Sequence, residues 1–158
     1  MTALLKPAAA RALAPLLDGL AASAGANRVG FDPVELPHRY REARDIEVAA
    51  LLSASLAYGR AGLFKPKAEG LLGAMGPSPA SFVERLDVAS AARLLHGFVY
   101  RFNVGTDVAV LLLAMGWAAR ERGGLEAVFA EQLARHGEVR GALAGFTFAL
   151  RSSVPLPP

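Results

Sequence analysis

Residues 48–58 read Val-Ala-Ala-Leu-Leu-Ser-Ala-Ser-Leu-Ala-Tyr and contain no charged side chain. A helix that is apolar around its whole circumference is typical of a buried position. The alanines and serines in this stretch are small, so neighbouring helices can approach it closely. We therefore predict a central helix that begins near Asp45, whose carboxylate would cap its N-terminus, and that stops at Gly59.

The rest of the chain also favours helices. Apolar residues recur at helical spacing almost everywhere, and strict two-residue alternation is missing. We predict an all-α, multi-helix orthogonal bundle, with residues 1–152 as a single helical domain and residues 153–158 as a proline-rich tail. The further predicted helices are 7–24, kinked or divided at Pro15; 62–75, with Pro66 tolerated only in the first turn; 79–86, capped by Ser78; a helix capped by Asp87; a long helix capped by Thr106; 125–136; and 138–151. A loop is predicted after the first of these helices, at Gly25, Asn27 and Gly30.

Composition limits the classes of protein to which this chain can belong. The chain has 158 residues, of which 53% are hydrophobic and 20% are charged, so one packed domain is expected and disorder is not. Cysteine is absent, which excludes disulfides and cysteine-ligated metals. Lys6, Arg11 and Asp18 interrupt the apolar N-terminus, and the longest uncharged apolar run, residues 108–119, is too short to span a bilayer. We predict a cytoplasmic protein without a membrane partner.

Asp32, Glu35 and His38 are spaced three residues apart, which on a helix would place them on one face. Such a group suits a metal or acid–base site, but Pro33 and Pro37 argue against a helix and predict an extended or turned segment. The favoured interpretation is a solvated loop in which Asp32 caps a turn. No glycine loop for phosphate and no nucleophile elbow is present, so we predict no cofactor and no metal.

Basic residues concentrate between residues 38 and 67, where acidic residues compensate about half of their charge. The alternatives are a solvated face of ion pairs and a surface that contacts nucleic-acid phosphates. Residues 100–102, Tyr-Arg-Phe, form a second group that either contacts nucleic acid or anchors a loop through its aromatic pair. Our candidates for contact with phosphate are Arg39, Arg60, Lys65 and Arg101, with Tyr58 as a stacking surface.

Several stretches follow one another in a specific order. Residues 32–40 read Asp-Pro-Val-Glu-Leu-Pro-His-Arg-Tyr, residues 44–49 read Arg-Asp-Ile-Glu-Val-Ala, and residues 56–60 read Leu-Ala-Tyr-Gly-Arg. Tyr100-Arg101-Phe102 and then Gly124-Leu125-Glu126 with Phe129 follow later. In this order the chain resembles a widespread prokaryotic family of conserved hypothetical proteins, classed as a domain of unknown function, from about residue 32 onward. That resemblance implies no known activity.

A second resemblance concerns the scaffold. Residues 51–55, the lysine-bearing helix after them and Ser78-Pro79-Ala80 are similar to the first helices of endonuclease III-type helix-hairpin-helix DNA glycosylases. Residues 97–124 are similar in layout to the part that precedes the hairpin in those enzymes. The resemblance implies a partial glycosylase-like scaffold with DNA as its partner. Ser55 stands where the enzymes often carry a glutamine that fills the gap left by an extruded base, and serine is too short for that role.

Full-length members of the hypothetical family continue with a Lys-Arg segment and a Leu-Asp-Thr-His motif, similar to the glycosylase segment that bears the catalytic aspartate. This sequence stops at Pro158, before either, so the resemblance implies no catalytic residue here and predicts a truncated or split member that is inactive alone. We predict weak DNA binding. The competing predictions are an interaction module, whose exposed apolar surface pairs with a C-terminal half, another chain or a second copy, and a small-molecule enzyme that uses Asp32, Glu35 and His38.

Overall fold

The computed structural model describes residues 7–23, 30 and 32–154, and in these residues the fold is all-α apart from one two-stranded hairpin. The predicted fold class is therefore confirmed. The predicted loop at Gly25 and Asn27 and the tail from residue 155 lie outside the described residues. In chain order the elements are α1 (Pro7–Ser23), the 3-10 turns η2 (Pro33–Glu35) and η3 (Pro37–Arg39), α2 (Ala43–Leu56), α3 (Ala61–Met75), α4 (Pro79–Arg85), α5 (Val88–Leu94), β1 (Val99–Tyr100), β2 (Asn103–Val104), α6 (Gly105–Arg122), α7 (Leu125–His136) and α8 (Val139–Ser153).

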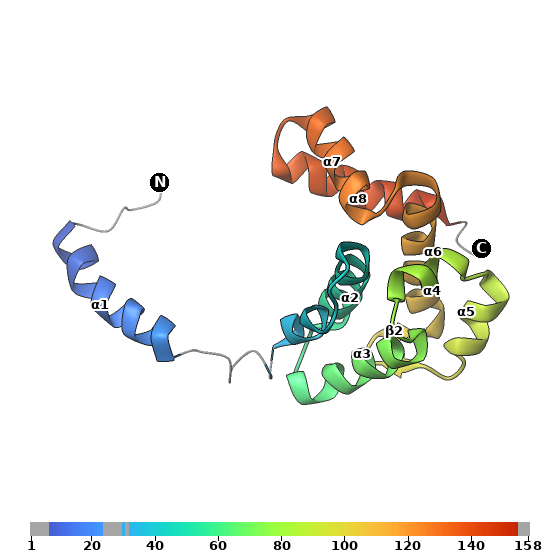
Figure 1. Cartoon of the computed structure of the whole chain (residues 1–158), viewed down its shortest axis with the longest axis horizontal. Coiled ribbons are helices and arrows are strands. Elements are labelled where there is room, and N and C mark those ends of the chain that lie inside the picture. The colour runs from blue at the N-terminus through green and yellow to red at the C-terminus, as the bar shows by residue number, and fades with distance from the viewer. Residues whose placement is uncertain (1–6, 24–29, 31, 155–158) are drawn as a thin grey trace.

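The apolar stretch forms α2, which lies in the middle of the molecule (Figure 1). It contacts α3, α4, α6, α7 and both 3-10 turns. Val48, Leu52 and Leu56 are buried, whereas Ala54 is exposed and Leu51 is half-buried. The prediction of a central helix is confirmed, but the helix is covered on one side and not around its whole circumference.

Asp45 does not cap its own helix, contrary to the prediction. α2 begins at Ala43 with Glu42 at its N-cap. The buried Asp45 carboxylate instead turns toward α4, where its Oδ1 accepts hydrogen bonds from the Ala80 N–H and the Ser78 hydroxyl, both at 2.9 Å. As predicted, Ser78 caps α4 by accepting a hydrogen bond from the Ser81 N–H. Two side chains therefore cap the N-terminus of α4: Ser78, which precedes the helix, and Asp45 of α2.

Two further polar residues of α2, Arg44 and Glu47, bind the junction between α6 and α7. Arg44 donates from Nη2 to the Ala119 carbonyl near the C-terminus of α6, at 2.9 Å. Glu47 accepts from the Leu125 N–H at the N-terminus of α7, at 2.8 Å. A cation at a helix C-terminus and an anion at a helix N-terminus both complement the helix dipole. Residues 44–47 thus link α2 to three other helices.

α1 runs through Pro15 without being divided, so division, one of the two predicted effects of this proline, does not occur. Two local predictions were wrong. α3 contains Pro66 in its second turn rather than its first. The carbonyl that Pro66 leaves without a helical donor belongs to the exposed Gly62, where water can replace the missing N–H. Thr106 is not the cap of α6: the N-cap is Val104, whose N–H donates to the Asp107 carboxylate at 2.8 Å.

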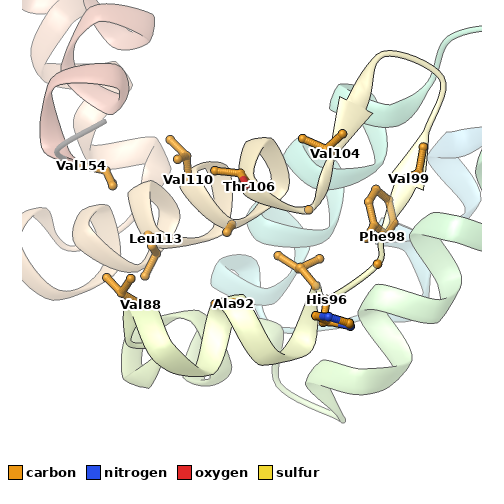
Figure 2. A pocket seen from close by; sticks show the side chains of 14 residues that line it. Val88, Ala92, His96, Phe98, Val99, Val104, Thr106, Val110, Leu113 and Val154 are labelled. Carbon is orange, nitrogen blue, oxygen red and sulfur yellow. The ribbon is translucent and has the colours of Figure 1, made fainter. Parts of the chain in front are cut away.

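β1 and β2 form an antiparallel hairpin that the sequence did not predict, because two-residue strands are too short to show alternation. Beside it an apolar groove of about 820 Å³ runs between α5 and the first half of α6, which Figure 2 shows. Val99 and Val104 of the hairpin border one end of the groove, and Val154, which follows α8, borders the other. The groove is a concave apolar surface that the described chain leaves open.

Candidate functional site

The segment that contains Asp32, Glu35 and His38 is more regular than predicted. Of the two predicted conformations, extended or turned, it adopts the turned one and forms η2 and η3, each with a proline in its first turn. Proline suits that position because its ring fixes φ near the helical value and its missing N–H would have no helical partner there. The Asp32 carboxylate caps η2 by accepting from the Val34 N–H at 2.9 Å, as predicted.

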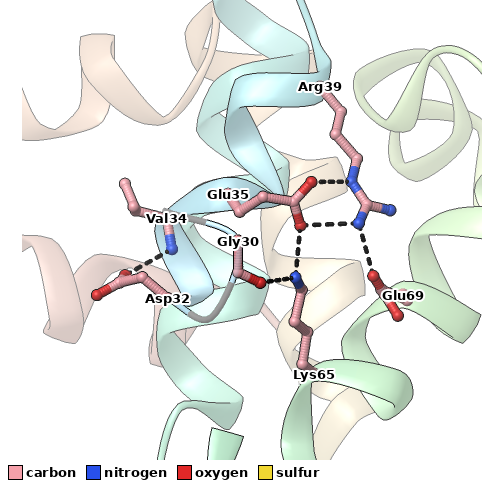
Figure 3. Close-up of polar contacts among 7 residues, drawn as sticks. All are labelled: Gly30, Asp32, Val34, Glu35, Arg39, Lys65 and Glu69. Atoms are coloured by element: carbon pink, nitrogen blue, oxygen red, sulfur yellow. Dashed lines mark hydrogen bonds and ion pairs between the residues drawn. The ribbon is translucent and has the colours of Figure 1, made fainter. Parts of the chain in front are cut away.

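An ion-pair network ties these turns to α3 (Figure 3). The Glu35 carboxylate receives two hydrogen bonds from Arg39, 2.6 Å from Nε and 2.7 Å from Nη2, and lies 2.9 Å from Lys65 Nζ. Arg39 also reaches Glu69 at 2.6 Å, and Lys65 donates to the Gly30 carbonyl at 2.5 Å. Two cations and two carboxylates therefore neutralise one another.

The network changes the interpretation of the predicted residues. The bidentate Arg39 hydrogen bonds, reinforced by Lys65, lower the Glu35 pKa to about 2, so this carboxylate is ionised near neutral pH. His38 is exposed, and Asp32 points away from the network in Figure 3. Across the described ranges no three His, Asp or Glu side chains gather as metal ligands. The structure thus brings Arg39 and Lys65 together with Glu35 but leaves Asp32 and His38 outside.

Tyr58, by contrast, lies against the hairpin. Its hydroxyl has one proton to donate and lies 2.7 Å from Asn103 Oδ1 and 3.1 Å from the Tyr100 carbonyl oxygen, which share it, while the Tyr100 hydroxyl donates to the Tyr58 carbonyl at 2.5 Å. The two rings pack with centroids 5.0 Å apart. Burial, with Tyr100 beside it, raises the Tyr58 pKa, so the phenol stays protonated and remains a donor. These bonds fix the hairpin to the turn between α2 and α3.

At the tip of the hairpin Arg101 and Phe102 project beside Tyr58. Arg101 has a φ of 53°, in the left-handed region that only glycine adopts without strain. Its guanidinium lies against the Gly59 backbone, so a Cβ on Gly59 would come within 2.7 Å of Nη2. The Phe102 ring is 85% exposed and stacks on Tyr58 with centroids 6.2 Å apart and planes 17° apart. We call Tyr58, Gly59, Arg60, Arg101 and Phe102 the aromatic corner.

The aromatic corner therefore holds three of the predicted contact residues: the structure brings Arg101 beside Tyr58 and Gly59, and Arg60 follows Tyr58 by two residues in the chain. Arg60 and Arg101 are exposed, and in the described part of the chain neither forms an ion pair with a carboxylate. Asp107 is the acidic residue whose charge reaches Tyr58, and its carboxylate is bonded to a backbone N–H of the hairpin. The aromatic corner is thus an exposed ring flanked by uncompensated positive charge.

Sequence reasoning named Phe102 only as part of the group Tyr100-Arg101-Phe102, which was expected either to contact nucleic acid or to anchor a loop through its two rings. The buried Tyr100 has that anchoring role, and Phe102 faces solvent. Arg101 and Phe102 form the turn between β1 and β2, where strand alternation does not apply, so nothing in Tyr100-Arg101-Phe102 signalled which ring would face solvent. Glu69, the second partner of Arg39, gave no comparable signal because thirty residues separate them.

Comparison with known proteins identifies one relationship. Residues 32–155 match the model of a family described as Protein of unknown function (DUF2400). Neither the search of curated proteins nor the search of solved structures finds a match. The matched range holds every element from η2 to α8, the ion-pair network and the aromatic corner. Because the match covers well over half of the sequence, the chain belongs to the DUF2400 family of proteins of unknown function.

Proposed function

We propose that this chain is a non-catalytic, DNA-contacting helical domain on a glycosylase-like scaffold, and that it binds single-stranded DNA weakly through the aromatic corner. One observation carries the proposal: the 85% exposed Phe102 ring, stacked at 17° on Tyr58. A solvent-facing ring supported from behind offers a flat surface to an unpaired base, and stacking of this kind tolerates any sequence. The scaffold assignment comes from the sequence resemblance.

Charge supports the same surface. Arg60 and Arg101 are exposed and, in the residues described, unpaired with carboxylates, so phosphate can bind them without displacing a protein partner. Arg39 and Lys65 would first have to leave Glu35 and its network. We therefore retain Arg60 and Arg101 as phosphate contacts and assign Arg39 and Lys65 to holding η2 and η3 on α3.

Contacts within the aromatic corner also restrict its backbone before any ligand binds. The reciprocal hydrogen bonds between Tyr58 and Tyr100 and the packing of Arg101 on Gly59 fix the position of the hairpin tip. A preformed surface loses less conformational entropy on binding than a flexible one. With one exposed ring and two arginines the surface is small, which is why the proposed binding is weak.

Fluorescence anisotropy with labelled single-stranded and duplex DNA, over a series of salt concentrations, tests the proposal. Two phosphate contacts predict a slope of log K against log salt of about −1.4 for the single strand. Phe102→Ala should weaken binding of the single strand by about 5- to 150-fold, because stacking contributes ~1–3 kcal/mol per base. Arg101→Gln should reduce the slope to about −0.7.

Phe148→Ala is the matched control, because Phe148 on α8 is also a strongly exposed phenylalanine, at 73%. It should leave binding unchanged. Duplex DNA should bind less tightly than the single strand, since its bases are already stacked on each other. Absence of binding at low salt, or equal losses in Phe102→Ala and Phe148→Ala, would overturn the proposal.

A further inference from the structure

α1 presents an apolar stripe that the described residues leave uncovered. None of its residues is buried, and Figure 1 shows it apart from the other helices. The leucines recur at i, i+3, i+4 and i+7, which is the pattern of an amphipathic helix that binds in an apolar groove. Their exposed fractions are 38%, 65%, 58% and 59% for Leu13, Leu16, Leu17 and Leu20.

The groove beside α6 is the complementary surface. Among the residues that line it only His96 and Thr106 have polar side chains (Figure 2). Val88 on one wall is 71% exposed, and Val99 at the end is 55% exposed. Large aliphatic side chains left open around a concave apolar surface are typical of an interaction site. The α6 residues that face the groove repeat the leucine spacing: Thr106, Ala109, Val110 and Leu113.

The two surfaces match in length as well as in chemistry. A span of seven residues on each helix corresponds to about 10 Å along its axis. In Figure 1 α1 lies at one end of the molecule and α5 and α6, whose residues line the groove, lie toward the other, with α2 and α3 between them. α1 is therefore far from the groove of its own copy, whereas no such distance separates it from the groove of a second copy.

We propose that α1 of one copy docks into the groove between α5 and α6 of a second copy, and that the second α1 docks reciprocally. The product is a two-fold symmetric dimer with exchanged N-terminal helices, and each copy contributes the same stripe and the same groove. Exchange of an element on the chain end requires no new fold, because only the position of α1 differs between monomer and dimer.

Sedimentation velocity of the full chain over a range of concentrations should show a dimer. Leu17→Asp in the stripe and Val110→Asp in the groove should each raise the dimer dissociation constant by at least about tenfold, since each buries a charge in an apolar contact. Val88→Asp is a second groove variant, and at 71% exposure this side chain is not part of the core. Ala22→Asp, on the face of α1 opposite the leucines, is the control and should leave the dimer intact.

Mixing separates exchange from other kinds of pairing. Leu17→Asp retains its groove and Val88→Asp retains its stripe, so a mixture of the two should form a heterodimer through one intact contact. If α1 helices paired with each other, Val88→Asp would remain a dimer; if grooves paired, Leu17→Asp would. Either of those results, a monomeric wild-type chain, or a mixture that stays monomeric would overturn the proposal. Circular dichroism checks that each variant retains its helices.

Discussion

Replacing Asp45 with alanine should destabilise the protein more than the loss of any exposed cap. The Asp45 side chain is buried, at 6% exposure, and accepts from the Ala80 N–H and the Ser78 hydroxyl. In Asp45→Ala the Ala80 N–H has no other acceptor in the described structure, which costs about 1–3 kcal/mol, and the weaker Ser78 bond adds ~1 kcal/mol. We expect a total loss of about 2–4 kcal/mol in the free energy of unfolding, a large share of the ~5–15 kcal/mol typical of a domain.

Urea unfolding followed by circular dichroism and by fluorescence of Trp117, the single tryptophan, measures this loss. Asp45→Asn keeps an oxygen acceptor without the charge and should lose about half as much. Asp87→Ala is the comparison, because the exposed Asp87 carboxylate caps α5 by accepting from the Ser90 N–H at 2.7 Å. If Asp45→Ala is no more destabilising than Asp87→Ala, the assignment of Asp45 as a link between helices is wrong.

Three further substitutions probe other contacts. Gly59→Ala places a side chain at a φ of 87°, where residues other than glycine are strained, so it should cost about 1–3 kcal/mol in thermal unfolding. The flexible Arg101 guanidinium, 2.7 Å from the new Cβ, should move aside, and an unchanged melting temperature would contradict the expected strain. Ser53→Ala removes a buried hydroxyl that has no partner in the described residues, so the free energy of unfolding measured in urea should stay constant or rise by up to ~1 kcal/mol. A clear loss of stability would refute this expectation. The Glu35 pKa is lowered from 4.5 to about 2, so the ionised Glu35 should stabilise the fold by about 1–2 kcal/mol after solvent screening. This stabilisation should be present above pH 4.5 and disappear as the pH falls toward 2, where the stability of Glu35→Gln should approach that of wild type. A difference in stability that does not change with pH would contradict this contribution of Glu35.

Local sequence signals were sufficient to predict several features of the fold. The bounds of α7, Leu125–His136, follow from the glycines on either side, and the caps Ser78 and Asp87 bond to N–H groups three residues further on. The Glu35–Arg39 pair, at i and i+4, was also within reach of sequence spacing. In each case the two interacting groups lie within one turn of the chain.

Contacts between distant residues could not be predicted in the same way. The sequence around an aspartate in the first turn of a helix is the same whether its carboxylate caps that helix or another one. Asp45 caps a helix whose bonded residue, Ala80, is thirty-five residues away. Tyr58 and Arg101 were each singled out, but their meeting depends on the hairpin, whose strands are too short to show a pattern. Arg39 is a similar case. Its charge is evident from the sequence, but the sequence gives no indication that Glu69 would neutralise it.

A titration of isotopically labelled protein with single-stranded DNA, followed by amide NMR shifts, tests the proposed binding surface most directly. The aromatic corner predicts that the earliest and largest shifts fall on residues 58–60 and 101–103. Residues of the ion-pair network, Arg39 and Lys65, should shift little because their charges are already neutralised. Largest shifts at η2 and η3, or no shifts at low salt, would contradict the aromatic corner as the DNA contact.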